Sequence, residues 1–136
     1  MLNSIIMDEI VENDFYKFYK IDGILYSENK GSGFIDGEAA KKIVEMRHQI
    51  SNNTSQYWCM DIKNIKSFDK EARDYSDKYG QELLFACAVL IDSHVTKFLF
   101  NTYLKLKNPQ IPMQVFTKKE EAVKWLLQIK IKNENK

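Results

Sequence analysis

The chain has 136 residues, of which 44% are hydrophobic and 29% are charged, and its 20 lysines and arginines nearly balance its 19 aspartates and glutamates. These values predict a single globular domain over residues 1–136, large enough to bury a core without a disulfide or a metal. The formal net charge of +1 argues against a broad nucleic-acid-binding surface, which would be strongly basic. No apolar run has the form of a signal peptide or reaches the roughly 18 residues of a membrane span, so we expect a cytoplasmic protein.

The first elements are predicted to form an antiparallel hairpin. Residues 15–21 are rich in aromatic side chains and roughly alternate, and residues 24–26 form a second apolar run. Asp22-Gly23 between the two runs is a strong hairpin signal, because both residues tolerate the backbone conformation that a two-residue turn requires. Residues 5–11 are compatible with a further strand or with an irregular arm.

Strand and helix patterns alternate along the rest of the chain. Short apolar runs predict buried strands, and apolar residues at a spacing of 3.6 predict the helices between them. The predicted elements are a helix over 36–50 with Asp36 as its N-cap, a strand over 57–62, a helix from about 69 to 79, a strand over 85–91, a helix over 94–107, a strand over 113–116, a closing helix that begins at a capping box of Thr117 and Glu120, and a frayed tail over 131–136. This order predicts an α/β fold with a mixed sheet and right-handed crossovers.

Three segments carry a resemblance to a known family, and they lie at 61–73, 88–97 and 111–126. Together with the order of elements, they are similar to the STAS-like fold of anti-sigma-factor antagonists, and more specifically to small bacterial STAS-like proteins of unsettled function. The resemblance covers residues 5–128. It implies a mixed sheet with an N-terminal antiparallel hairpin followed by successive βα units, and a regulatory role exercised by binding a protein.

The phosphorylation site of that family is missing from its position. In phosphorylatable members a strand ends in aspartate, and a second aspartate further on is followed directly by a serine at a helix N-terminus. Asp61 and Asp69 match the two acidic positions, but Lys70 and Glu71 follow. Ser67 precedes the second aspartate and fits a capping or loop role. We therefore predict that this loop is not a working phosphorylation switch.

The remaining chemistry-bearing residues match no catalytic or metal-binding motif. They are the glycines Gly31, Gly33 and Gly37, the histidine His48, the cluster Asp92-Ser93-His94 and the cysteines Cys59 and Cys87. The glycine spacing is one residue longer than the dinucleotide fingerprint, and no Walker lysine follows. The Asp-Ser-His cluster fits helix capping, and both cysteines lie in apolar runs, as reduced core residues do. We predict no cofactor, no metal and no enzymatic activity.

The predicted helix over 94–107 has apolar residues on two sides. Its core face comprises Val95, Phe98, Leu99, Thr102 and Leu106. Phe100 and Leu104 project from nearly the opposite side, where another part of the chain, a second subunit or an amphiphilic ligand could cover them. We predict a subunit interface at this pair.

The predicted function is that of a non-enzymatic STAS-like module that binds a protein and self-associates as a homodimer. Its predicted interaction loop comprises Asp61, Ser67, Asp69, Lys70 and Glu71. The alternative is a small-molecule or lipid-binding domain that uses an apolar cleft beside the helix over 94–107. A deep apolar pocket would favour the alternative.

Overall fold

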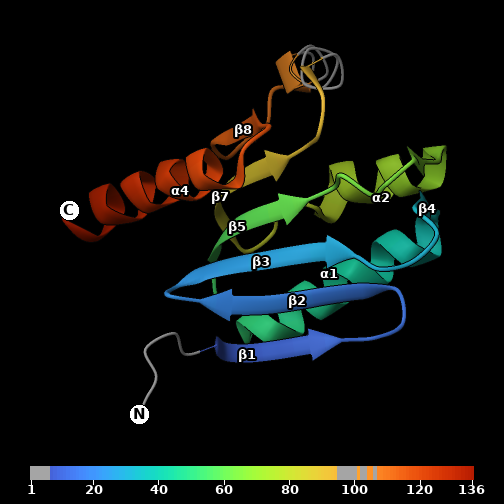
Figure 1. Ribbon diagram of the computed structural model, residues 1–136, viewed down its shortest axis with the longest axis horizontal. Helices are drawn as coiled ribbons and strands as arrows, with labels where there is room; N and C mark the ends of the chain where they lie inside the picture. The colour runs from blue at the N-terminus through green and yellow to red at the C-terminus, as the bar shows by residue number, and fades with distance from the viewer. Residues whose placement is uncertain (1–6, 95–100, 102–103, 106) are drawn as a thin grey trace.

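The computed structural model describes residues 7–94, 101, 104–105 and 107–136. A mixed sheet of six strands forms its centre, in the order β1-β2-β3-β5-β7-β8 (Figure 1). The strands are β1 (Met7–Glu12), β2 (Tyr16–Ile21), β3 (Ile24–Asn29), β5 (Gln56–Asp61), β7 (Leu84–Leu90) and β8 (Met113–Phe116). The described helices are α1 (Gly37–Ser51), α2 (Lys70–Tyr79) and α4 (Lys119–Glu134), and His94, Asn101, Leu104, Lys105 and Lys107 are also helical.

The sheet changes direction at β3. Strands β1, β2 and β3 pair antiparallel, whereas β3, β5, β7 and β8 pair parallel. The parallel strands are joined through helical segments, as parallel strands require. The predicted mixed sheet with an antiparallel start and successive βα units is confirmed.

The predicted hairpin turn forms between β2 and β3. Asp22 and Gly23 have φ angles of 52° and 80°, so both occupy the left-handed region, as the two central residues of a type I′ turn do. Ile21 and Ile24 are directly opposite each other across the turn. The two-residue turn thereby fixes which side chains of β2 and β3 share a face of the sheet.

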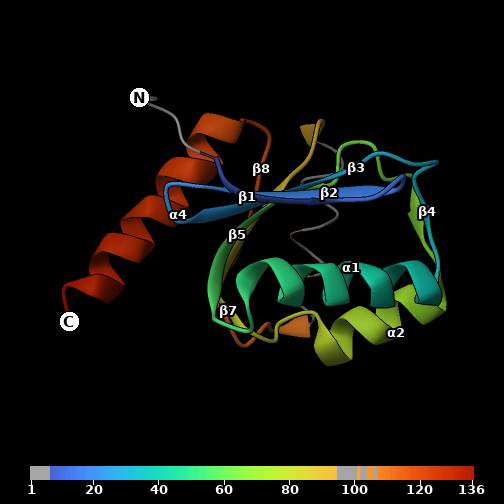
Figure 2. The ribbon, with the colours of Figure 1, turned by 90° about the horizontal axis from the view of Figure 1, so that it is seen from below.

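The two faces of the sheet are covered by different helices. Figure 2 shows α1 and α2 on one side and α4 on the other. On the first side, here called the α1 face, the buried residues include Phe18, Leu25, Trp58, Cys87 and Val89 from the sheet and Met46 and Ile50 from α1. On the α4 face, they include Ile24, Tyr57, Cys59 and Leu90 from the sheet and Ala122 and Leu126 from α4. Burial on both faces explains the nearly unbroken apolar runs of β5 and β7.

The last helix differs from its prediction at both ends. Its N-cap is Lys118, which makes no side-chain capping bond, so the predicted capping box of Thr117 and Glu120 does not form. The helix continues to Glu134 through the segment predicted as a frayed tail. There, Asn133 Nδ2 donates a hydrogen bond of 3.1 Å to the hydroxyl of Tyr57 on β5. Packing against the sheet, rather than local capping, sets the bounds of this helix.

Two short strands were not predicted. They are β4 (Phe34–Ile35) and β6 (Ser67–Phe68), which pair parallel in a sheet of their own. Gly33, at φ 90°, precedes this pairing, and its carbonyl accepts hydrogen bonds from the backbone N–H groups of Lys66 and Ser67 at 2.7 and 3.1 Å. The glycine-rich stretch therefore ties the loop after β3 to the loop before α2.

Candidate functional site

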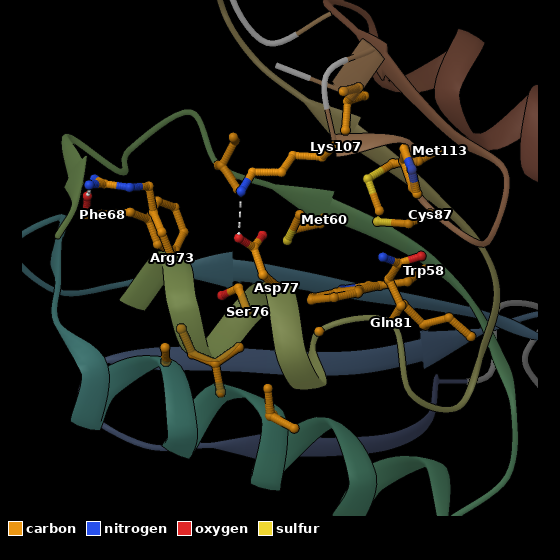
Figure 3. A pocket seen from close by; sticks show the side chains of 18 of the residues that line it. Trp58, Met60, Phe68, Arg73, Ser76, Asp77, Gln81, Cys87, Lys107 and Met113 are labelled. Carbon is orange, nitrogen blue, oxygen red and sulfur yellow. Dashed lines mark hydrogen bonds and ion pairs between the residues drawn. The ribbon is translucent and has the colours of Figure 1, made fainter. Parts of the chain in front are cut away.

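A cavity of about 410 Å³ lies on the α1 face of the sheet (Figure 3). It is bounded by the sheet, by α1 and α2, and by residues between 104 and 113 that lead into β8. Most of its walls are apolar, and Tyr16, Trp58, Met60, Cys87, Leu104 and Met113 are among the side chains that form them. A concave, mostly apolar space of this size is typical of sites that bind small molecules.

The alternation of the strands places these side chains on one face. Trp58 and Met60 of β5 line the cavity, while Cys59 between them packs on the α4 face. Trp58 lies opposite Cys87 of β7, which in turn lies opposite Met113 of β8. The parallel register therefore builds one continuous wall from three strands.

Trp58 is held in place from several sides. Its Nε1 donates a hydrogen bond of 2.9 Å to Ser27 Oγ on β3. The ring of Phe18 packs beside it with 6.0 Å between centroids, and the guanidinium of Arg47 lies 5.0 Å from the centroid of the indole ring. These contacts fix the orientation of the indole ring within the cavity wall.

Arg47 is a fully buried charged residue on α1. Its Nη1 and Nη2 donate to the carbonyl oxygens of Glu82 and Gly80 at 2.6 and 3.3 Å, and its Nε is buried without a hydrogen-bond partner. Burial lowers the pKa of the guanidinium to about 10, so Arg47 stays protonated at neutral pH. The side chain connects α1 to the turn between α2 and β7, which includes cavity-lining residues Gly80 and Gln81.

Arg47 was not predicted from the sequence as a functional or buried residue, although a signal was present. Arg47 lies four residues after Ile43 and three before Ile50, on the apolar stripe of the helix. A cation inside such a stripe indicates either a long side chain that reaches solvent or a buried charge with a structural role. The structure shows the second.

Polar side chains gather along the α2 side of the cavity. Lys107 Nζ forms an ion pair with Asp77 Oδ2 at 2.9 Å, and Figure 3 shows the two side chains pointing toward each other. Arg73 Nη1 donates to the carbonyl oxygen of Phe68 at 2.7 Å. Gln81 Oε1 accepts the backbone N–H groups of Gln110 and Ile111 at 2.7 and 3.2 Å. The cavity thus combines apolar walls with a polar edge.

The two cysteines are free thiols on opposite faces of the sheet. Burial raises the pKa of Cys59 to about 11 and that of Cys87 to about 12. Both thiols are therefore protonated at neutral pH and weak as nucleophiles. Cys87 lines the cavity as a small apolar group, in agreement with the prediction that both cysteines are reduced core residues.

The predicted interaction loop connects β5 to α2. Asp61 ends β5, and its Oδ1 accepts the backbone N–H of Lys63 at 2.9 Å. Ser67 is exposed on β6, where it lies opposite Phe34. Glu71 is exposed in the first turn of α2. The loop is therefore a surface feature in which the Asp61 side chain has a local structural role.

Asp69 and Lys70 mark the start of α2. Asp69 is its N-cap and accepts the backbone N–H of Ala72 at 2.8 Å. Lys70 is the first helical residue, and its Nζ pairs with Asp74 at 2.8 Å. The position where the resemblance requires a phosphorylated serine thus carries an exposed lysine.

Replacing Asp69 by alanine should lower the free energy of unfolding by about 1 kcal/mol, because the N-terminal N–H groups of α2 lose their side-chain acceptor. Urea unfolding followed by circular dichroism measures this change. Asp74→Ala on the same helix removes only the exposed ion pair with Lys70, which is expected to contribute about 0.5 kcal/mol or less, and serves as the control. Equal stability of Asp69→Ala and wild type would contradict the capping role.

The remaining residues singled out from the sequence include the two histidines. His48 Nε2 lies 3.9 Å from Glu82 Oε1, and burial lowers the pKa of His48. His94 is exposed. Within residues 7–94, 101, 104–105 and 107–136, no three His, Cys, Asp or Glu side chains are placed to hold a metal ion.

The predicted interface pair is only partly described. Phe100 lies outside the described residues. Leu104 is half-buried, packs against the core of the α1 face and lines the cavity. The contacts of Leu104 are therefore within the chain. They lie on the wall of an apolar cleft, which is the feature that the alternative prediction of a small-molecule or lipid-binding domain requires.

Comparison with known proteins supports the fold and gives a family. A family model described as "Domain of unknown function (DUF7793)" matches residues 18–130. No curated protein matches the chain. A crystal structure of an uncharacterized protein from the DUF3478 family of Shewanella loihica PV-4, with a SpoIIAA-like fold, has a TM-score of 0.62 and 13% sequence identity, over 93% of this chain and 96% of that chain.

At that identity the likeness to the solved structure concerns the fold, and it confirms the predicted STAS-like architecture. No helix in the described part of the chain is long and apolar enough to cross a membrane. The family match extends from the second strand into the last helix and includes all of the described cavity-lining residues except Tyr16. The chain therefore belongs to the DUF7793 family and has a SpoIIAA-like fold.

Proposed function

We propose that this protein is a non-enzymatic binding module that takes up an amphiphilic small molecule in the cavity on the α1 face. The observation that carries the proposal is the cavity itself, about 410 Å³ in volume, with apolar walls and a polar edge. An alkyl tail would lie against Trp58 and the sulfur-containing side chains of Met60 and Met113. A polar head group would lie near Asp77 and Lys107.

The composition of the walls supports a flexible apolar ligand. Methionine side chains adapt to irregular shapes, and Met60, Met113 and the thiol of Cys87 present polarizable atoms to the cavity. Each methylene group that leaves water for such a site contributes about 0.8 kcal/mol, or about fourfold in affinity. Affinity should therefore rise with tail length until the cavity is full.

The proposal can be tested with straight-chain alcohols from 1-hexanol to 1-decanol, measured by isothermal titration calorimetry. Met60→Trp places an indole in the cavity and should weaken binding of 1-decanol by about tenfold or more, because the ring occupies the space of the tail. Ile129→Trp makes the same enlargement at a partly buried site on the α4 face and should leave binding unchanged. Absence of binding by every alcohol, or equal weakening by both variants, would contradict the proposal.

A second candidate function is protein binding by the loop between β5 and α2. With this second function we also propose that the protein is cytoplasmic and that it self-associates. One observation favours the loop: Phe34, which pairs with Ser67 beside it, is 65% exposed. An exposed aromatic residue next to charged side chains is a common centre of protein interfaces. Light scattering of wild type and of Phe34→Ser tests whether this surface joins two copies; a monomeric wild type at high micromolar concentration would contradict self-association.

A further inference from the structure

The described side chains that line the cavity include more positively charged than negatively charged groups. Arg73, Asp77 and Lys107 are the charged residues among the described side chains that line it, so two cations accompany one anion. Lys107 and Asp77 pair with each other, and Arg73, one helical turn before Asp77 on α2, donates to a backbone carbonyl. The described lining side chains therefore include one more cation than anion, and the Asp74 carboxylate, whose pKa is lowered mainly by Lys70 and also by Arg73 and Lys107, does not line the cavity.

A third cation lies directly behind the wall. The guanidinium of Arg47 packs 5.0 Å from the ring centroid of Trp58 and bonds the carbonyl of Gly80, and both of these residues line the cavity. Among the described residues, Arg47 forms no ion pair, although the nearby Glu82 carboxylate partly offsets the effect of burial on its pKa. Because the side chain is fully buried, water screens its charge poorly, and the charge lies directly against two residues of the cavity wall.

We propose that the ligand of this cavity is an alkyl monocarboxylate, whose anionic head group binds between Lys107 and Arg73 while its tail lies along Trp58 and Met60. This inference rests on the proposed function and specifies the chemical class of the ligand. Lys107 supplies an ammonium group that can be shared between the carboxylate and Asp77. Arg73 supplies a guanidinium, whose paired donors suit a carboxylate.

The charge of the head group can be varied at constant tail length. Decanoate is ionised at pH 7, 1-decanol is neutral and decyltrimethylammonium is cationic. Titration calorimetry below the micellar concentration of each compound should give decanoate an affinity about tenfold higher than that of 1-decanol, which is the effect of one charge-assisted hydrogen bond. The cationic compound should bind most weakly.

Two variants and one control test which groups carry the preference. Lys107→Gln should remove most of the difference in affinity between decanoate and 1-decanol, because it removes the charge that only the carboxylate would pair with. Asp77→Asn should increase the preference for decanoate, because it removes the competing anion. Lys105→Gln changes an exposed lysine two residues from Lys107 that does not line the cavity, and it should have no effect.

The outcomes separate this inference from the proposed function. Binding of all three compounds with equal affinity, or tightest binding of the cationic one, overturns the carboxylate and leaves an amphiphile site. Binding of none overturns both. Since the comparison among the three compounds uses the unmodified protein, it decides the sign of the preferred charge even if a variant fails to fold. Preference for decanoate that survives in Lys107→Gln would overturn the assignment of Lys107.

Discussion

Replacement of Arg47 by alanine is expected to lower the free energy of unfolding by about 3 kcal/mol. The change leaves the carbonyl oxygens of Glu82 and Gly80 without their donors and creates a void beside Trp58. Loss of hydrogen bonds from a charged donor and loss of packing each destabilise by roughly 1.5–3 kcal/mol, and relief from burying the charge offsets part of the sum. Urea unfolding at neutral pH measures the net effect.

Two further variants make this result interpretable. Lys42→Ala changes an exposed cation on the same helix and should leave stability nearly unchanged. Arg47→Met keeps most of the buried volume but removes the donors, so it isolates the contribution of the hydrogen bonds. A more stable Arg47→Met protein would show that burying the charge costs more than its hydrogen bonds contribute.

Replacement of Leu126 by alanine should destabilise the protein by about 3 kcal/mol, because a fully buried leucine leaves a cavity when it is truncated. Leu126 lies on α4, which supplies the helical part of the buried cluster on its face of the sheet. The next residue, Leu127, is 37% exposed, so Leu127→Ala should cost less than about 1 kcal/mol. Thermal and urea unfolding of the two variants give the comparison, and equal losses would contradict the observed orientation of α4.

Much of the fold could be predicted because burial leaves a pattern in the sequence. The runs around Trp58 and Cys87 are apolar at consecutive positions, since their strands are covered on both faces. Asp36, the predicted N-cap of α1, accepts the backbone N–H of Ala39 at 2.8 Å, and α2 ends at Tyr79, where the helix was predicted to end. Elements with both a periodic apolar pattern and a local end signal were therefore predicted well.

Structural features that depend on tertiary contacts were predicted poorly from the sequence. Thr117 and Glu120 have the spacing of a capping box, but α4 begins at Lys119 because the positions of Ala122 and Leu126 against the sheet fix its rotation and start. The pairing of β4 with β6 depends on segments more than thirty residues apart, which have no shared local pattern.

The cavity is the clearest case of a feature without a sequence signature. It exists because side chains from five strands, from α1 and α2 and from the helical residues Leu104 and Lys107 leave a space between them, and no single segment encodes that space. The second apolar side of the helix over 94–107 was the available hint. Leu104 lies on that second side and lines the cavity. From the sequence alone, an apolar residue outside the core face fits a cavity wall and a subunit interface equally well, and the interface was predicted.

The late position of α4 along the chain also has a consequence for how the protein folds. Lys119 Nζ contacts the hydroxyl of Tyr19 across 100 residues, and Asn133 contacts Tyr57 across 76. During synthesis, one face of the sheet therefore remains open to water until α4 has emerged, and its apolar side chains are available to chaperones or to other nascent chains. Contacts of such long sequence separation slow folding, so we expect the final docking of α4 to limit the rate at which the native state forms.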